Sequence, residues 1–145
     1  MKKIVAATLF AGLFSSVSAF AGGVADIDVT LADGYNEFRL GTATDINLAQ
    51  QVNITAIPSR AGFVKNNFQA TLSANVAAGV VDDATGNRFG AVAGSNKGYT
   101  VFTGSSVGGS VSQCGDQVAK TVSGLASSLV EEDSLDLDNA NGCAL

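Results

Sequence analysis

The sequence contains no histidine, no tryptophan and one proline, and only 14% of its residues are charged. Without histidine, the side chain that most often acts as a general base near neutral pH is missing. The chain also lacks the G-x-S-x-G, P-loop and G-x-G-x-x-G motifs that mark common classes of enzyme. The composition therefore predicts a protein that is not an enzyme and that uses no cofactor.

Two short groupings of polar residues could still carry chemistry. Ser95 and Lys97 could form a dyad, and Asp82 and Asp83 could form a carboxylate pair. Both groupings stand among turn residues, where Ser, Asp, Asn and Gly are needed for the backbone conformation alone. We interpret both as turns.

Basic residues are also scarce, with 8 Lys and Arg against 13 Asp and Glu, a formal net charge of −5. They are scattered along the chain, which argues against binding to nucleic acid or to anionic lipid. The lack of tryptophan disfavours a carbohydrate-binding face. We expect the aromatic residues near predicted strands to pack in the core; these are Phe38, Phe63, Phe68, Phe89 and Phe102.

The N-terminus has the pattern of a secretory signal peptide. Lys2 and Lys3 precede an apolar run, and small residues lead to an A-x-A site that ends at Ala21. We expect residues 1–21 to be removed and residues 22–145 to form a single domain. No later apolar run is long enough for a transmembrane helix. The expected location is secreted, extracellular or at the cell surface, with the periplasm as the alternative.

Two cysteines, Cys114 and Cys143, remain in a chain that is expected to leave the cytoplasm. An even number of cysteines in an oxidising compartment predicts a disulfide bond. A metal or redox pair is disfavoured, because the chain lacks histidine and the spacing is not C-x-x-C. The bridge would tie the acidic C-terminal tail back to residue 114.

Alternation with period 2 indicates β-structure from Phe63 to Thr103. Between Val64 and Val80 apolar residues fall on one face of an extended chain and polar residues on the other. Turn residues follow at 82–87 and 95–98, so we expect one long strand, a second strand and a third strand at Tyr99 to Thr103. This architecture requires that the side chains of Val64, Phe68, Leu72 and Val76 lie together on one buried face.

Further strands are predicted nearer the N-terminus. Asp26 to Leu31 and Tyr35 to Leu40 alternate on either side of Asp33-Gly34, so we expect a hairpin. In the alternative, Val24 to Leu31 leaves its own domain and pairs with a neighbouring copy. Gln51 to Ile57 also favours a strand.

The C-terminal part predicts one helix. Residues 104–112 are rich in Gly and Ser and indicate either an edge strand or a mobile connection. Downstream, Asp116 can cap a helix from about 117 to 130 whose apolar stripe would pack on the sheet. The stripe consists of Val118, Val122, Leu125, Ala126 and Leu129.

The acidic tail offers weak calcium candidates, Asp133, Asp136 and Asp138. Their oxygen atoms suit calcium, but the segment departs from the EF-hand pattern, with Asn141 at the sixth position where that loop has Gly. We interpret the tail as a solvated polar segment and expect no metal site.

Together these features predict a mainly β fold, an antiparallel sandwich or curled sheet with one C-terminal amphipathic α-helix packed on it. The general layout is similar to small exported pilin-like or matrix subunits of bacteria, although no diagnostic residues match. We expect a non-enzymatic structural protein of a fibre, matrix or surface layer that associates with itself through strand edges. The alternative is a secreted or periplasmic module that binds a small apolar ligand between sheet and helix.

Overall fold

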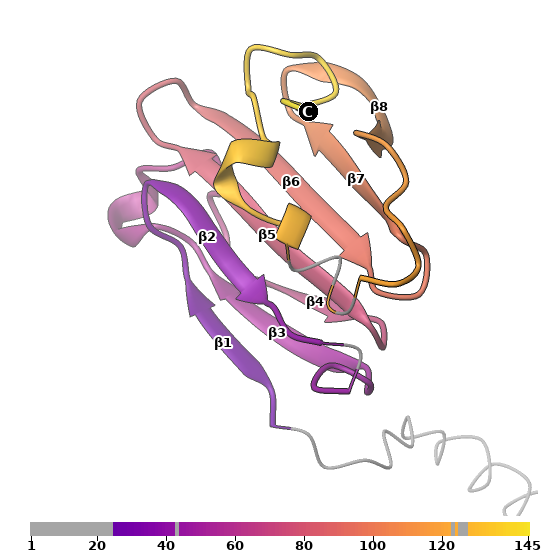
Figure 1. Ribbon diagram of the computed structural model, residues 1–145. Helices are drawn as coiled ribbons and strands as arrows, with labels where there is room; N and C mark the ends of the chain where they lie inside the picture. Colours follow the sequence, from indigo (N-terminus) through magenta and orange to yellow (C-terminus); the bar gives the residue numbers. More distant parts are fainter. Residues whose placement is uncertain (1–24, 43, 123, 125–127) are drawn as a thin grey trace, which may run out of the picture.

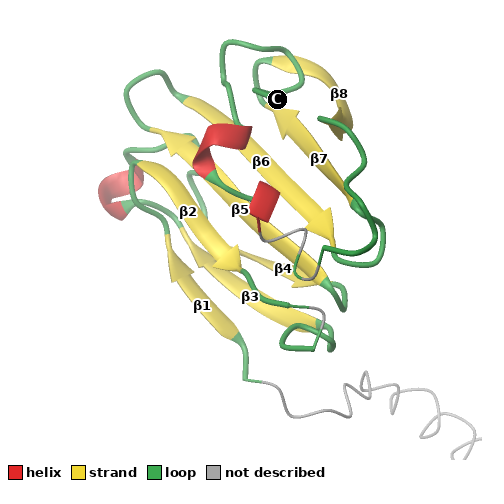
Figure 2. Ribbon diagram, in the orientation of Figure 1, coloured by secondary structure: helices red, strands yellow, loops and turns green. Residues whose placement is uncertain are grey.

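The computed structural model describes residues 25–42, 44–122, 124 and 128–145, and its strands form two sheets (Figures 1 and 2). The predicted signal peptide and its cleavage site lie outside the described residues. The strands are β1 (Ile27–Thr30), β2 (Gly34–Arg39), β3 (Gln50–Thr55), β4 (Phe68–Leu72), β5 (Val76–Asp83), β6 (Arg88–Ser95), β7 (Thr100–Ser105) and β8 (Gly108–Cys114). Two short 3-10 turns, η1 (Pro58–Arg60) and η2 (Glu132–Ser134), complete the elements.

The small sheet has the strand order β1-β3-β4, and the large sheet has the order β2-β5-β6-β7-β8. Every pairing is antiparallel except that of β1 with β3, which is parallel. The predicted mainly β class is therefore confirmed. The turns expected at 82–87 and 95–98 join β5 to β6 and β6 to β7. Within the Gly- and Ser-rich segment 104–112, residues 104–105 end β7, and residues 108–112 belong to the edge strand β8.

The long strand expected between Val64 and Val80 is wrong, because Asn75 breaks it. Asn75 has a left-handed backbone (φ 63°), and its N–H donates to the carbonyl of Ile46 at 2.6 Å. The chain therefore crosses from β4 in the small sheet to β5 in the large sheet. The expected shared buried face does not form either, since Phe68 is 42% exposed.

The expected N-terminal hairpin is also wrong. β1 pairs with β3 in the small sheet, whereas β2 pairs with β5 in the large sheet. Asn36 stabilises this crossing, because its side chain accepts from the N–H of Ala32 at 2.7 Å and donates to the carbonyls of Ala32 and Gly34. The Asp33-Gly34 turn thus connects two sheets and not two neighbouring strands.

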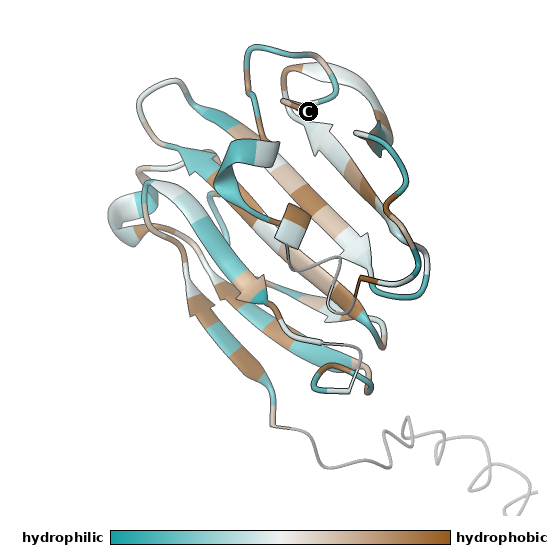
Figure 3. Cartoon of the chain, viewed as in Figure 1, coloured by the Kyte–Doolittle hydropathy of each residue, from teal (hydrophilic) through white to brown (hydrophobic). Residues whose placement is uncertain are grey.

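Two apolar cores lie on opposite faces of the large sheet. The inter-sheet core joins the small sheet to β5, with Leu31, Val52, Ile54 and Val80 buried at its centre. Alternating apolar and polar bands along β1 in Figure 3 show the period-2 pattern that creates its inner face. The second core lies on the other face and consists of Ile46, Ala77, Val92, Val101 and Val130, with Tyr35, Leu40, Leu129 and Leu135 packed against it.

The C-terminal segment covers this second face without the predicted amphipathic helix. Residues 117–122 form turns and coil; residues 123 and 125–127, which include two members of the predicted apolar stripe, lie outside the described residues. Gly124 has φ +71°, a left-handed conformation incompatible with a continuous α-helix, and Val122 is 43% exposed. The N–H of Val118 instead donates to the carbonyl of Tyr99 at 3.0 Å. This bond to the β6–β7 turn and a local turn bond from the N–H of Val122 to the carbonyl of Ala119 are the backbone hydrogen bonds seen here in place of a helical pattern.

The predicted disulfide is present between Cys114, at the end of β8, and Cys143, with a Cα–Cα distance of 5.4 Å. It fixes the C-terminal segment beside β8. Close packing of this segment depends on a glycine, because a Cβ at Gly90 would meet the side chain of Leu137. Within the described residues, no helix has the length and apolar character needed to cross a membrane.

Candidate functional site: an apolar groove beside β4

The small sheet covers only part of the large sheet. The inter-sheet core takes side chains from β2, β5 and β6, and within the described chain it takes none from β7 or β8. Since β7 and β8 follow β6 in the strand order, they extend past the small sheet. One side of the sandwich is therefore open, with β4 as its edge in the small sheet.

An apolar groove of about 390 Å³ lies on this uncovered face of β6, β7 and β8. Strand pairing fixes its floor, because Ala93 lies opposite Phe102 and Ala91 lies opposite Gly104. Val111 of β8 lies over Gly104, where a Cβ atom would be only 3.0 Å from its Cγ2. The groove is lined by Phe89, Ala91, Ala93, Phe102, Thr103, Gly104, Ser105, Ser106 and Val111.

Aromatic side chains on the inner faces of both sheets stay partly exposed, and two of them, Phe89 and Phe102, line the groove. Phe102 is 46% exposed, and Phe63 stacks on Phe89 with a centroid distance of 6.0 Å. Phe68 belongs to the inward-facing row of β4, opposite Ile54, yet it is exposed. Inward-facing residues become buried only where the opposite sheet covers them. Their exposure shows that this part of the sandwich lacks a covering strand.

The backbone of β4 adds hydrogen-bonding groups to this open side. Among the described residues β4 pairs with β3 alone, so the N–H and C=O groups along its other edge have no strand partner. An exposed edge of this kind can pair with another extended chain. The groove and the β4 edge together offer an apolar floor and a row of backbone donors and acceptors.

None of the described residues that line the groove has a charged or titratable side chain. The hydroxyl groups of Ser105 and Ser106 are used locally, since they accept from the N–H groups of Val107 at 3.1 Å and Phe89 at 2.8 Å. A site with these side chains can bind an apolar group or an extended chain, but its lining residues supply neither a general base nor an activated nucleophile.

The weak calcium candidates do not converge on one position. Asp136 caps a local turn, accepting from the backbone N–H of Asp138 at 2.9 Å and from the Asn139 side chain at 3.0 Å. Asp133 is exposed in η2. In the part of the chain that the structure describes, no group of three acidic or cysteine side chains could hold a metal ion. The placement gives the calcium alternative no support.

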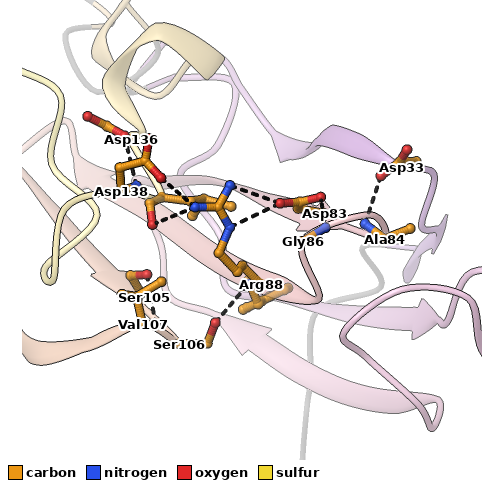
Figure 4. Close-up of polar contacts among 12 residues, drawn as sticks. Asp33, Asp83, Ala84, Gly86, Arg88, Ser105, Ser106, Val107, Asp136 and Asp138 are labelled. Carbon is orange, nitrogen blue, oxygen red and sulfur yellow. Dashed lines mark hydrogen bonds and ion pairs between the residues drawn. The ribbon is translucent and has the colours of Figure 1, made fainter.

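Asp138 instead belongs to a polar cluster around Arg88 (Figure 4). The Arg88 guanidinium contacts Asp138 at 2.6 Å and Asp83 at 3.1 Å, and it donates to the carbonyl of Leu137 at 3.3 Å. The N–H of Gly86, with support from Arg88, holds the pKa of the Asp83 carboxyl below its usual value, and the hydrogen bond to Asp138 raises the pKa of Arg88. The cluster joins the C-terminal tail to the β5–β6 hairpin.

The two polar groupings noted in the sequence are also structural. Asp82 is fully buried and accepts from the N–H of Phe63 at 2.5 Å, whereas Asp83 turns to the other face toward Arg88. They form no carboxylate pair. The Ser95 hydroxyl accepts from the N–H of Lys97 at 3.3 Å, as expected in a turn.

Sequence reasoning missed the groove because it assigned the phenylalanines to the core. Their period-2 positions identify the face on which they lie but not whether a second sheet covers that face. Comparison of the chain with protein-family models, curated proteins and solved structures finds no significant match. The proposals below therefore rest on the groove itself.

Proposed function

We propose that this chain is an exported, non-enzymatic structural subunit that associates with other copies through the open side of its sandwich. The single observation that carries the proposal is the apolar groove that lies beside the unpaired edge of β4. An exposed strand edge next to uncovered aromatic side chains is a ready template for sheet extension. Self-association would cover both features at once.

Two further features support export. Residues 1–21 have the pattern of a signal peptide. The Cys114–Cys143 disulfide is of the kind that persists in oxidising compartments. We therefore propose an extracellular or cell-surface location, with the periplasm as the alternative.

The test is the molecular mass of the purified mature chain, measured by light scattering over a range of concentrations. We expect mass to rise with concentration, and Phe102→Ser to weaken association by at least about tenfold, because a buried phenyl group contributes ~1.5–3 kcal/mol. Val107→Ser is the matched control, since Val107 is 49% exposed but does not line the groove. A chain that stays monomeric at all concentrations contradicts the proposal.

A second candidate function is the binding of a small apolar ligand. The sequence placed such a site between sheet and helix, but the predicted helix is not seen, and the groove lies on the opposite face of the large sheet. Its volume of about 390 Å³ and its apolar lining favour this candidate. Apolar ligand that co-purifies with the wild type but not with Phe102→Ser, in a strictly monomeric chain, would support ligand binding over assembly.

A further inference from the structure

The open side of the sandwich has room for an added strand but not for a second sandwich. β4 contacts β5 of the large sheet, so the position next to β4 lies over the strands that follow β5, where the groove is lined by β6, β7 and β8. If a second small sheet paired with β4 in the same plane, its own large sheet would have to occupy the space of β7 and β8. The occupant must therefore be a single extended segment that is free of its own large sheet.

The surroundings define the chemistry of this segment. Its inward side chains would meet the apolar floor formed by Ala93, Phe102 and Val111. Its outward side chains would continue the polar outer face of the small sheet, where Asn53 donates to Asp28 and Gln69 donates to Asn53, both at 2.8 Å. The occupant needs apolar residues at every second position and polar residues between them.

The chain itself contains a segment with this pattern. In β1 and the residue after it, Ile27, Val29 and Leu31 point inward and alternate with Asp28 and Thr30. These apolar residues already pack on the same face of the large sheet, because they belong to the inter-sheet core. We propose that residues 26–31 of a second copy occupy the groove beside β4. This inference rests on the proposed function and names the contact that produces it.

Charge supports the same occupant. The loop that leads into β4 carries Arg60 and Lys65, and neither forms an ion pair with any residue that the structure describes, although the Lys65 ammonium donates to the carbonyls of Arg60 and Gly62 in its own loop. The incoming segment carries Asp26 and Asp28, both exposed in their own domain. Acidic side chains on the donor and basic side chains beside the acceptor edge favour this pairing over pairing of two acceptor edges.

The position of β1 makes it available for exchange. It lies at the edge of the small sheet and, among the described strands, pairs only with β3. Its four residues are half-buried or exposed, and Leu31, the residue after it, is the one fully buried side chain that the segment would have to withdraw from the inter-sheet core. Its connection to β2 also lies at the surface, with Ala32 and Asp33 exposed. An edge strand can leave its sheet at lower cost than a central strand, because fewer backbone hydrogen bonds are broken.

Disulfide trapping between differently tagged chains tests the contact. One chain carries Asp28→Cys, and the other carries Gln69→Cys or Thr71→Cys, the two outward positions of β4. Within one chain residues 28 and 69 lie two strands apart, about 9.5 Å, beyond the reach of a disulfide, so the trapped bond must join two chains. Thr85→Cys, exposed in the β5–β6 turn, is the control partner.

We expect the yield of disulfide-linked mixed dimers to be at least tenfold higher with cysteine at position 69 or 71 than with cysteine at position 85. A synthetic peptide of residues 25–32 should suppress them, whereas the same peptide with serine in place of Ile27 and Val29 should not. Association in light scattering without mixed dimers at 69 or 71 overturns the assignment of β1 and leaves the proposed function standing. A strictly monomeric chain overturns both.

Discussion

Tyr35 is the residue that most directly joins the C-terminal segment to the large sheet. Its hydroxyl donates to the carbonyl of Val130 at 3.0 Å, and its ring lies where a Cβ at Gly79 would be. Burial, followed by repulsion from Glu37, raises the pKa of Tyr35 to about 12. A tyrosine in this position stays protonated in the folded protein after it has ionised in the unfolded chain.

The raised pKa predicts a specific loss of stability at alkaline pH. The contribution of Tyr35 is fully present below the unfolded pKa of about 10 and is lost as pH rises toward about 12. Tyr35→Phe should lower the free energy of unfolding by about 1 kcal/mol at pH 7, because one hydrogen bond is lost. The difference from wild type should narrow between pH 10 and 12 in urea titrations. If the free energies of unfolding of wild type and Tyr35→Phe instead change in parallel between pH 10 and 12, Tyr35 does not have the raised pKa.

Arg39 shows how one residue can change faces within a strand. Simple alternation places it with Tyr35 and Glu37, but a register shift between Glu37 and Arg39 turns it inward opposite Ala78. It is 6% exposed and donates to the backbone carbonyls of Val76, Leu48 and Ser73. Desolvation lowers its pKa. A bulge of this kind cannot be identified from the period of the sequence.

At the scale of elements, the C-terminal segment covers one face of the large sheet and is attached to the rest of the protein at several points. The disulfide holds its end, the Arg88 cluster holds residues 137–138, and Val130 is fully buried in the second core. With few regular hydrogen bonds of its own, the segment depends on these contacts. Its order should therefore respond strongly to loss of the covalent bond.

Replacement of both cysteines by serine tests this dependence. The bridge spans a sequence separation of 29 residues, for which the loop-entropy model gives a stabilisation of about 3.5 kcal/mol. We expect Cys114→Ser with Cys143→Ser to lower the free energy of unfolding by about that amount in urea. Limited proteolysis should cut residues 115–145 before either sheet. Early cleavage within β5 or β6 would show that the segment is not the first part to open.

For the whole molecule, the net charge opposes the association that we propose. The chain carries 13 acidic and 8 basic residues, so copies repel one another at neutral pH. Lowering the pH protonates carboxylates and brings the net charge toward zero. The described lining of the groove carries no charge, so the apolar contacts in the groove should keep their affinity.

We therefore expect association to strengthen as pH falls from 7 toward about 4.5, where carboxylates begin to protonate. Light scattering at constant ionic strength is the measurement. Adding salt at pH 7 should act in the same direction, because it screens repulsion between copies. Asp83, with its lowered pKa, should be among the last carboxylates to protonate. Association that weakens on acidification would contradict the expectation that repulsion between copies outweighs the attraction of Asp26 and Asp28 to Arg60 and Lys65.

The sequence by itself determined the local features. Alternation and turn residues predicted the extended segment that became β3 and the turns that join β5, β6 and β7, and the two cysteines predicted their bridge. These predictions succeed because side-chain period and turn conformation depend on neighbouring residues. The helix predicted from the i, i+4 spacing after Asp116 is not seen, because Gly124 adopts a left-handed conformation and the N–H of Val118 bonds to the carbonyl of Tyr99 in the β6–β7 turn.

Only the tertiary structure decided which strands share a sheet and which faces stay open. β1 and β2 separate, and Asn75 divides one alternating run between two sheets. A strand with alternating apolar and polar residues can pair equally well with a strand of either sheet. Which sheet it joins depends on how much apolar surface the complete set of strands buries. The groove follows from the same choice, because a small sheet of three strands cannot cover a large sheet of five.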